Sequence, residues 1–182
     1  MSELEVLVQL QELDTRLSQL SHRFATLPEH QQITEVQGEE VRLGEQLDTV
    51  MIELKVLRRS QTDREAEVQG LEDKIAKSTS ALYGGDITSP KEAAAMQNEI
   101  ESISRRQTVL EDQIIELMEQ IEPFALEEAG IEAQRSVGGE TLRDLEEQLA
   151  VAQAEIEVEQ RAVNTERAQI EERAGDDLVA LY

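Results

Sequence analysis

The side chains that most often bind metals are sparse in this sequence and are not arranged as a site. Its two histidines, His22 and His30, lie eight residues apart on either side of Pro28, and the chain has no cysteine. A metal site needs ligands that converge with carboxylates, and this spacing gives no reason for convergence. We therefore interpret both histidines as solvated helix residues.

Motifs for nucleophilic, acid–base or phosphate chemistry are also missing. Acidic pairs such as Glu39–Glu40 and Asp176–Asp177 are plentiful, but no pocket is implied that would shift their pKa values. The glycine pairs Gly84–Gly85 and Gly138–Gly139 do not belong to a G-x-x-x-x-G-K-[ST] phosphate loop. We expect no catalysis, no metal site and no cofactor in this chain.

The composition is typical of coiled coils. Only 2% of the 182 residues are aromatic, whereas 31% are charged, and the chain has few prolines and glycines. Ala, Glu, Gln, Leu, Arg and Ile dominate, and these residues favour helices. Little apolar surface is available for a conventional core, so we expect it to be buried along an apolar seam between helices.

Charge and hydropathy exclude several classes of partner. The formal net charge of −23 disfavours contacts with nucleic acid, which depend on Lys and Arg at phosphates, and with anionic membrane surfaces. The first residues are acidic and amphipathic, unlike a signal peptide, and no apolar run approaches the roughly 18 residues of a membrane span. We expect a cytoplasmic protein without a membrane segment.

Apolar residues spaced by three and four predict a helical first arm over residues 2–82. The frame is lost at Pro28 and restarts at Val36. Ahead of Pro28 the seam positions are Leu10, Leu13, Leu17, Leu20, Phe24 and Leu27. After it they are Val36, Glu40, Leu43, Leu47, Val50, Leu54, Leu57, Gln61, Arg64, Val68, Leu71, Ile75, Ser78 and Leu82.

A tip loop at 83–89 separates this arm from a second arm at 90–174, and a further helix is expected to start at 176–182. Ser89, Pro90 and Glu92 form a helix-start signal of the S-x-x-E type. One frame then runs from Ala93 to Ile170, weakening near Gly138. Two arms around a short loop predict an all-α fold, a long antiparallel coiled-coil helical hairpin. A single long helix would have to pass through the two loop glycines, so we reject it.

A register that places Leu82 opposite Lys91 brings helix breakers of both arms to one height. Gly38 would then lie opposite Arg135, and Gly44 near Gly130. Gly138 and Gly139 would fall opposite Glu35 and Thr34, and Pro28 would lie a few turns further along its own arm. Glycine and proline both weaken helices, so this clustering predicts a kink or hinge. Tolerated sequence variation is the alternative explanation.

Polar residues at three seam positions, Gln61, Arg64 and Gln107, fit a layer that fixes register. The alternative is a basic contact patch, because several arginines fall at the same level: Arg58, Arg59, Arg64, Arg105 and Arg106. Residues 55–106 hold nine basic and nine acidic side chains, while the remainder holds 31 acids and eight bases. This segregation predicts that the two ends of the hairpin meet different partners.

The tip contains residues that helix capping does not require: Tyr83, Asp86, Ile87 and Lys91. A minimal turn needs only a few residues and no aromatic side chain. Two interpretations remain open. Tyr83 and Ile87 either pack on each other and seal the seam, or form a partner-binding surface oriented by Asp86 and Lys91.

The tip segment LYGGDITSPKE, residues 82–92, resembles that of the bacterial coiled-coil and C4-type zinc-ribbon proteins. Weaker similarity extends along the chain, at Leu7, Leu10, Gln11, Asp14, Met96, Gln97, Glu99, Ile100 and the residues 177–182. Members of that family continue into a ribbon with two Cys-x-x-Cys pairs, to which nothing here corresponds. The resemblance implies a role as an adaptor, an alternative RNA polymerase sigma factor as partner, and zinc only where a ribbon exists.

Three functions therefore compete. The first is a non-catalytic adaptor or scaffold that contacts a protein partner through the tip. The second is a structural spacer or dimerisation element, and the third is a nucleic-acid-binding regulator that acts through a zinc ribbon. The expected assembly is a monomer or weak homodimer.

Overall fold

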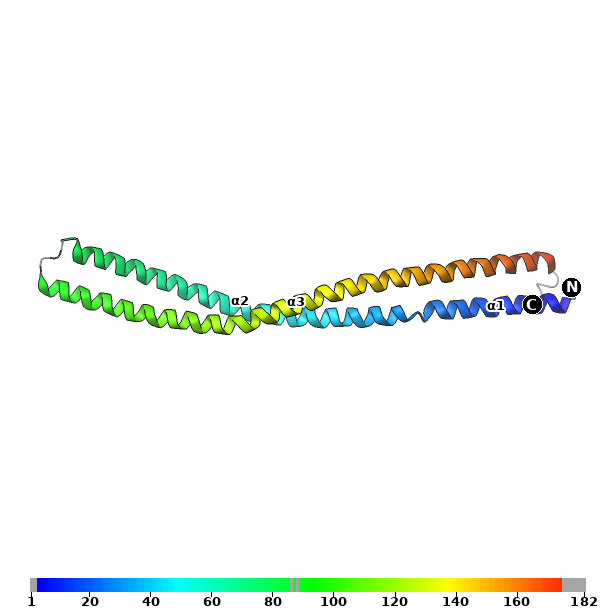
Figure 1. The fold of residues 1–182 in the computed structure, drawn as a ribbon, viewed down its shortest axis with the longest axis horizontal. Coiled ribbons are helices and arrows are strands. Elements are labelled where there is room, and N and C mark those ends of the chain that lie inside the picture. The colour runs from blue at the N-terminus through cyan, green and yellow to red at the C-terminus, as the bar shows by residue number, and fades with distance from the viewer. Residues whose placement is uncertain (1–2, 86, 88, 175–182) are drawn as a thin grey trace. The chain divides into compact units, whose positions relative to one another are not determined.

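The computed structural model describes residues 3–85, 87 and 89–174, all of which lie in helices or in the links between them. Within these residues, three helices follow one another: α1 (Glu3–Ala25), α2 (Pro28–Tyr83) and α3 (Pro90–Ala174) (Figure 1). The expected fold class, an all-α antiparallel coiled-coil helical hairpin, is confirmed. The helix expected at 176–182 lies outside the described residues.

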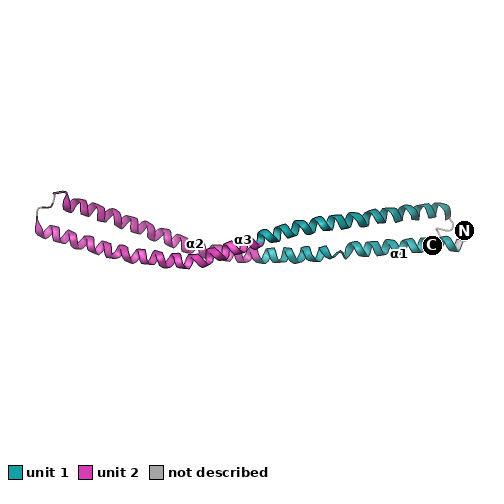
Figure 2. Cartoon of the chain, viewed as in Figure 1, with its two compact units in different colours: residues 1–42, 135–182 teal, residues 43–134 magenta. Residues whose placement is uncertain are grey.

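The chain divides into two compact units (Figure 2). Unit 1 combines residues 1–42 with 135–182, and unit 2 comprises residues 43–134. In unit 1, α1 and the start of α2 pack against the second half of α3. In unit 2, the rest of α2 packs against the first half of α3, and the loop between these helices closes the hairpin.

Unit 1 contains a continuous buried cluster. Leu10 and Ile156 are fully buried and Val163 is 2% exposed, so α1 and α3 meet along the predicted seam. Leu17, Phe24, Leu149 and Ala152 pack around this cluster, whose remaining members are Val6, Leu13, Leu20, Leu27 and Ile170. Burial of this apolar surface stabilises the unit by about 25 cal/mol per Å² removed from water.

The break between α1 and α2 occurs at Thr26 and Leu27, directly ahead of Pro28. The Thr26 amide donates to the carbonyl of His22 at 3.0 Å, which completes the last turn of α1. Pro28 then starts α2, because a proline at the first helical position lacks only an N–H that the helix would leave unpaired. Leu27 is 8% exposed and belongs to the buried cluster, so the seam continues through the break.

The glycines that we expected to weaken both arms do not interrupt them. α2 is helical through Gly38 and Gly44, and α3 through Gly130, Gly138 and Gly139. Within the described residues the arms are interrupted only at Thr26–Leu27. The boundary between the two units nevertheless falls in the region of these glycines, at 42/43 and 134/135.

Unit 2 has its own buried cluster, made by Leu43, Leu47, Val50 and Leu54 of α2 with Ile131 of α3. Ile121, Phe124 and Ala125 of α3 pack against it. Nearer the loop, among the described residues of this unit, only Leu71 and Leu110 are buried hydrophobics. That part of the seam is thinner and is supplemented by polar contacts between the arms.

Candidate interaction surfaces

In unit 2, α2 is followed by two glycines, and each position requires glycine for a different physical reason. A Cβ on Gly84 would lie 2.7 Å from the backbone carbonyl oxygen of Ser80, so a side chain here would force the helix end to move. Gly85 has φ of 89°, a left-handed conformation that glycine adopts at little cost. Any other residue at these two positions would strain the turn.

The beginning of α3 is set by the residues that follow. The carbonyl of Ser89 accepts a hydrogen bond from the Ala93 amide at 3.0 Å, which is the first bond of the helix. Pro90 occupies the first helical position, and Glu92 places a negative charge in the first turn, where the helix dipole favours it. Glycines, Ser89, Pro90 and Glu92 together account for the turn without Tyr83.

Tyr83 is the last residue of α2, and it is 77% exposed. The chain has only two tyrosines and two phenylalanines. Phe24 and Phe124 are half-buried against the two clusters, and Tyr182 lies outside the described residues. The structure thus leaves one of a very few aromatic side chains in solvent, where it buries nothing along the seam.

The other predicted tip residues are placed differently. Ile87 is half-buried and Lys91 is exposed in the first turn of α3. Asp86 lies outside the described residues. Leu82, not Tyr83, continues the half-buried positions of the α2 seam.

Four of the five arginines in the predicted basic patch bind side chains within unit 2. Arg58 lies 3.4 Å from Glu128, and Arg106 pairs with Glu67, so each joins α2 to α3. Arg105 lies 3.7 Å from Glu101 on its own helix, and the Arg64 Nε donates to Oε1 of Gln113 at 2.9 Å. Arg59 is exposed and has no side-chain partner in the described part of unit 2. These arginines therefore connect the arms more than they form one open patch.

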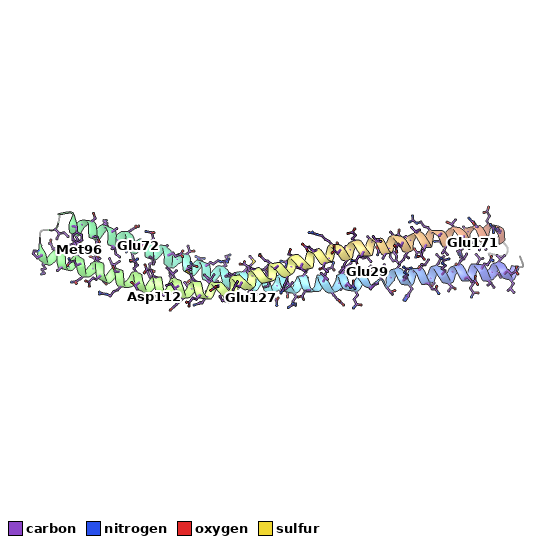
Figure 3. The ribbon with its side chains drawn as sticks, in the orientation of Figure 1. Glu29, Glu72, Met96, Asp112, Glu127 and Glu171 are labelled. Carbon is purple, nitrogen blue, oxygen red and sulfur yellow. The ribbon has the colours of Figure 1, made fainter. Side chains whose placement is uncertain are left out.

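The three polar seam positions are each satisfied by a flanking side chain instead of by one another. Gln61 donates to Glu65 at 2.7 Å, Arg64 reaches Gln113, and Gln107 donates to Glu111 at 2.7 Å. The contacts of Gln61 and Gln107 with Glu65 and Glu111 lie within one helix. Arg64 with Gln113, and Gln107 with Glu72 at 3.4 Å, join the two arms, and these directional contacts favour one register. Figure 3 shows the side chains along both helices, with Glu72 of α2 and Asp112 of α3 labelled.

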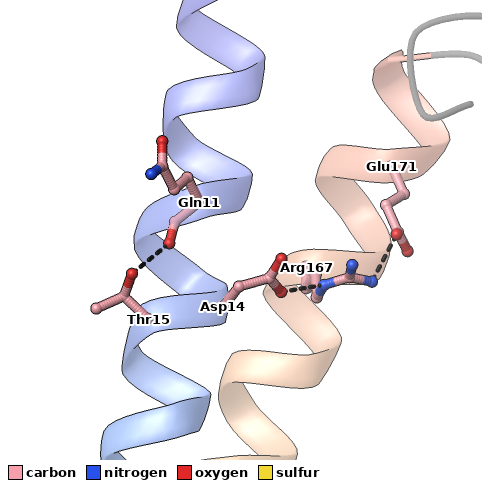
Figure 4. Close-up of polar contacts among 5 residues, drawn as sticks. All are labelled: Gln11, Asp14, Thr15, Arg167 and Glu171. Atoms are coloured by element: carbon pink, nitrogen blue, oxygen red, sulfur yellow. Dashed lines mark hydrogen bonds and ion pairs between the residues drawn. The ribbon is translucent and has the colours of Figure 1, made fainter. Parts of the chain in front are cut away.

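Ion pairs also join the helices of unit 1. Arg167 of α3 donates to Asp14 of α1 at 2.7 Å and also pairs with Glu171 (Figure 4). The hydrogen bond to Asp14 is the main cause that raises the pKa of Arg167 above its ordinary value. On α2, the hydrogen bond from Arg42 lowers the pKa of Glu39.

Glu40 explains one of the helix glycines. Its carboxylate accepts from Arg135 at 3.2 Å and lies over the backbone of α3 at Gly138. A Cβ at Gly138 would collide with the same carboxylate. Our register had placed Gly38 opposite Arg135, whereas Glu40 contacts both Arg135 and Gly138, so the register is shifted at this height.

Each of the two units has grooves on its surface. In unit 2, a groove of about 630 Å³ is lined by Asp48, Met51, Ile52, Lys55, Arg58 and Glu128. In unit 1, a groove of about 460 Å³ is lined mainly by acidic side chains: Glu29, Asp144, Glu147, Gln148, Val151, Ala152 and Glu155. Sequence reasoning missed both. The signal for the first is that Met51 and Ile52 fall between the seam positions Val50 and Leu54.

No group of three or more His, Cys, Asp or Glu side chains in the described ranges is placed to hold a metal ion. The same ranges contain no helix that is both long and apolar enough to cross a membrane. Within these residues, the polar surface therefore offers contacts and charge but no assembled metal site.

Comparison with known families adds to this geometry. Residues 10–182 match the CT398-like coiled coil hairpin domain. The chain belongs to this family. The coiled-coil part of the expected resemblance is therefore correct, and the match covers both units.

The relatives of this chain are longer than the part of them that it matches. An uncharacterized protein of Mycobacterium tuberculosis, Rv2229c, is 27% identical over 97% of this chain and 71% of its own length. A solved structure from Mycobacterium smegmatis superposes with a TM-score of 0.88 at 23% identity, covering 100% of this chain and 74% of that one. The structure of CT398 from Chlamydia trachomatis gives a TM-score of 0.64 at 18% identity, covering 99% and 75%. At these identities the solved structures support the fold alone.

Proposed function

We propose that this hairpin is a non-catalytic adaptor or scaffold that contacts a protein partner through the loop between α2 and α3. The observation that carries the proposal is the 77% exposure of Tyr83. Aromatic side chains are enriched among the residues that dominate protein–protein binding energies, because they bury much area at little entropic cost. Ile87 of the loop is half-buried, and Lys91 in the first turn of α3 is exposed.

The remainder of unit 2 suits a support for that loop. Ion pairs and hydrogen bonds join the arms at Glu67–Arg106, Arg64–Gln113 and Arg58–Glu128. They occur at successive heights along α2, and directional contacts of this kind disfavour sliding of one arm past the other. A loop held by two registered helices is presented in one orientation, as an adaptor requires.

The partner that we propose is a protein of the transcription machinery. The family resemblance points to an alternative RNA polymerase sigma factor, and we propose that the two proteins meet in the cytoplasm. The net charge of −23 makes nucleic acid a poor partner for this chain. Zinc does not fit the residues present, because thiolate ligands are absent from a sequence without cysteine. No cofactor forms part of the proposal.

The test is binding of a purified alternative sigma factor to the wild-type chain and to Tyr83→Ala, measured by isothermal titration calorimetry. The matched control is Val109→Ala, because Val109 of α3 is also an exposed apolar residue of unit 2, at 55%. We expect Tyr83→Ala to weaken binding at least about tenfold, as a contact residue worth about 1.4 kcal/mol would. The control should bind as the wild type does.

Two outcomes contradict parts of this proposal. Equal binding by wild type and Tyr83→Ala removes the loop as the contact site. Binding of no sigma factor removes that partner, and loop-dependent capture of a different protein would then keep the adaptor function. A chain that binds neither a sigma factor nor any other protein favours the competing interpretation, a structural spacer.

A further inference from the structure

The outward surface of α2 in unit 2 carries an ordered charge pattern around an exposed apolar pair. Met51 and Ile52 are 49% and 63% exposed and form part of the unit 2 groove. The acids Glu45 and Asp48 precede this pair, and the bases Lys55, Arg58 and Arg59 follow it. Along the helix the order is therefore acid, apolar, base.

These residues share a face of the helix. Positions separated by three, four and seven residues lie above one another on an α-helix, which places Asp48, Met51, Ile52 and Lys55 in one stripe. All four line the same groove. None of the described residues provides a side-chain partner for Asp48 or Lys55, whereas Arg58 is engaged by Glu128 at 3.4 Å. Asp48 and Lys55 are thus available to a second molecule.

We propose that this stripe binds the same stripe of a second copy, with the two α2 helices antiparallel about a twofold axis between Met51 and Ile52. Reversing the order acid–apolar–base gives base–apolar–acid, so the surface is complementary to itself only in this orientation. Asp48 of one chain meets Lys55 of the second copy, and Glu45 meets Arg58 or Arg59. The axis repeats each contact, as in any isologous interface.

The apolar pair supplies the centre of the contact. Met51 and Ile52 of one chain face Ile52 and Met51 of the second copy. Their exposed apolar surface is thereby removed from water in both chains. At one end of the stripe, a Cβ on Gly44 would meet nothing within 4 Å apart from its chain neighbours and the backbone of its own helix. This open space admits the long side chain of Arg59 from the second copy, next to Glu45.

Charge complementarity selects this occupant over others. A second copy supplies both the base for Asp48 and the acid for Lys55, whereas a uniformly acidic or basic partner would satisfy only one end. Each chain nevertheless carries a net charge of −23, so two chains repel each other. In physiological buffer, salt screens this repulsion beyond about 8 Å. One helical stripe also offers less than the roughly 1,600 Å² of a standard interface, so the dimer should be weak.

The test is the molar mass of the 182-residue chain by sedimentation equilibrium over a concentration series reaching the millimolar range. One chain has a mass of 20.5 kDa, and we expect the average to rise toward twice that value with concentration. Asp48→Lys and Lys55→Glu should each weaken self-association at least about tenfold, because like charges then face each other. Controls with the same charge changes outside the stripe are Asp63→Lys and Lys77→Glu, which should associate as the wild type does.

Mixing the two stripe variants gives the decisive result. In a dimer of one Asp48→Lys chain with one Lys55→Glu chain, each Lys meets an acid, so association should return although each variant alone stays monomeric. Far-UV circular dichroism verifies that both variants remain helical. A wild-type chain that is monomeric at every concentration overturns the proposal. So does a dimer that the stripe variants leave unchanged, or a mixture that fails to associate. None of these results depends on the sigma-factor experiment.

Discussion

Arg167 on α3 donates a hydrogen bond to Asp14 on α1, which lies 2.7 Å away in space and 153 residues earlier in the sequence. A second ion pair of unit 1, Glu40 with Arg135, lies nearer the start of α3. From Asp14 to Glu40 the first arm advances 26 residues, whereas from Arg135 to Arg167 the second arm advances 32. Measured from Gly138, which also contacts Glu40, the second arm advances 29.

The break at Thr26–Leu27 accounts for the direction of this difference. A non-helical residue can cover about 3.3 Å along the chain, whereas a helical residue rises 1.5 Å. The first arm therefore reaches the same length with fewer residues. A constant register along both arms, as we assumed from the sequence, fails where one arm contains an interruption that the other lacks.

Replacing Arg167 with Gln should lower the free energy of unfolding by about 1 kcal/mol, because two partly exposed charge-assisted contacts are lost. The matched control is Arg161→Gln on the same helix, since the Arg161 Nε bonds only the carbonyl of Glu157. Urea denaturation measures both. A double-mutant cycle with Asp14→Asn should give a non-zero coupling energy, and additive effects would contradict a direct interaction.

Leu54 is 1% exposed, and Leu54→Ala should destabilise unit 2 by about 2–4 kcal/mol through lost burial and a residual cavity. Val56, two residues later on the same helix, is 60% exposed. Val56→Ala should be neutral or slightly stabilising, because alanine has the higher helix propensity. Thermal and chemical denaturation followed by circular dichroism compares them. Similar losses for both variants would show that Leu54 does not lie in the seam.

Neighbouring glycines on α3 should respond in opposite ways to alanine. Gly139→Ala should stabilise the protein by about 0.5–1 kcal/mol, because open space surrounds its Cβ position and alanine favours the helix. Gly138→Ala should lose this gain or destabilise, since its methyl group displaces the Glu40 carboxylate from Arg135. In a Glu40→Ala background the two substitutions should become equivalent. Equal gains in the wild-type background would exclude the clash.

The Glu39 carboxyl should titrate below 4.5, its ordinary value, because Arg42 donates to its charged form. A lowered pKa in the folded state stabilises the fold above the unfolded value, and this contribution is lost as the pH falls through the folded-state pKa. NMR titration of the side-chain carbonyl carbon measures it directly. Arg42→Gln should raise the Glu39 pKa toward 4.5, whereas Arg16→Gln, on α1, should leave it unchanged.

Periodicity in the sequence was sufficient for the fold and for the seam. Leu10 and Leu54 were assigned to the seam from spacing alone, and both are among the most buried residues of the structure. An apolar stripe is a local property of a helix, so the spacing of three and four already predicts which face is buried. The start of α3 at Pro90 likewise follows from chemistry within a few residues.

Relations between the arms were decided only by the tertiary structure. Whether Arg58, Arg64 and Arg106 are open to a partner depends on which side chains of the facing helix lie within reach, and a shift of a few residues changes those neighbours. Gly138 was interpreted as a helix breaker, although it leaves room for Glu40. A sequence specifies which face of each helix is apolar, but the height at which two faces meet results from packing summed along both arms. The exposure of Tyr83 and the pairing of Arg167 with Asp14 therefore became known only from the folded chain.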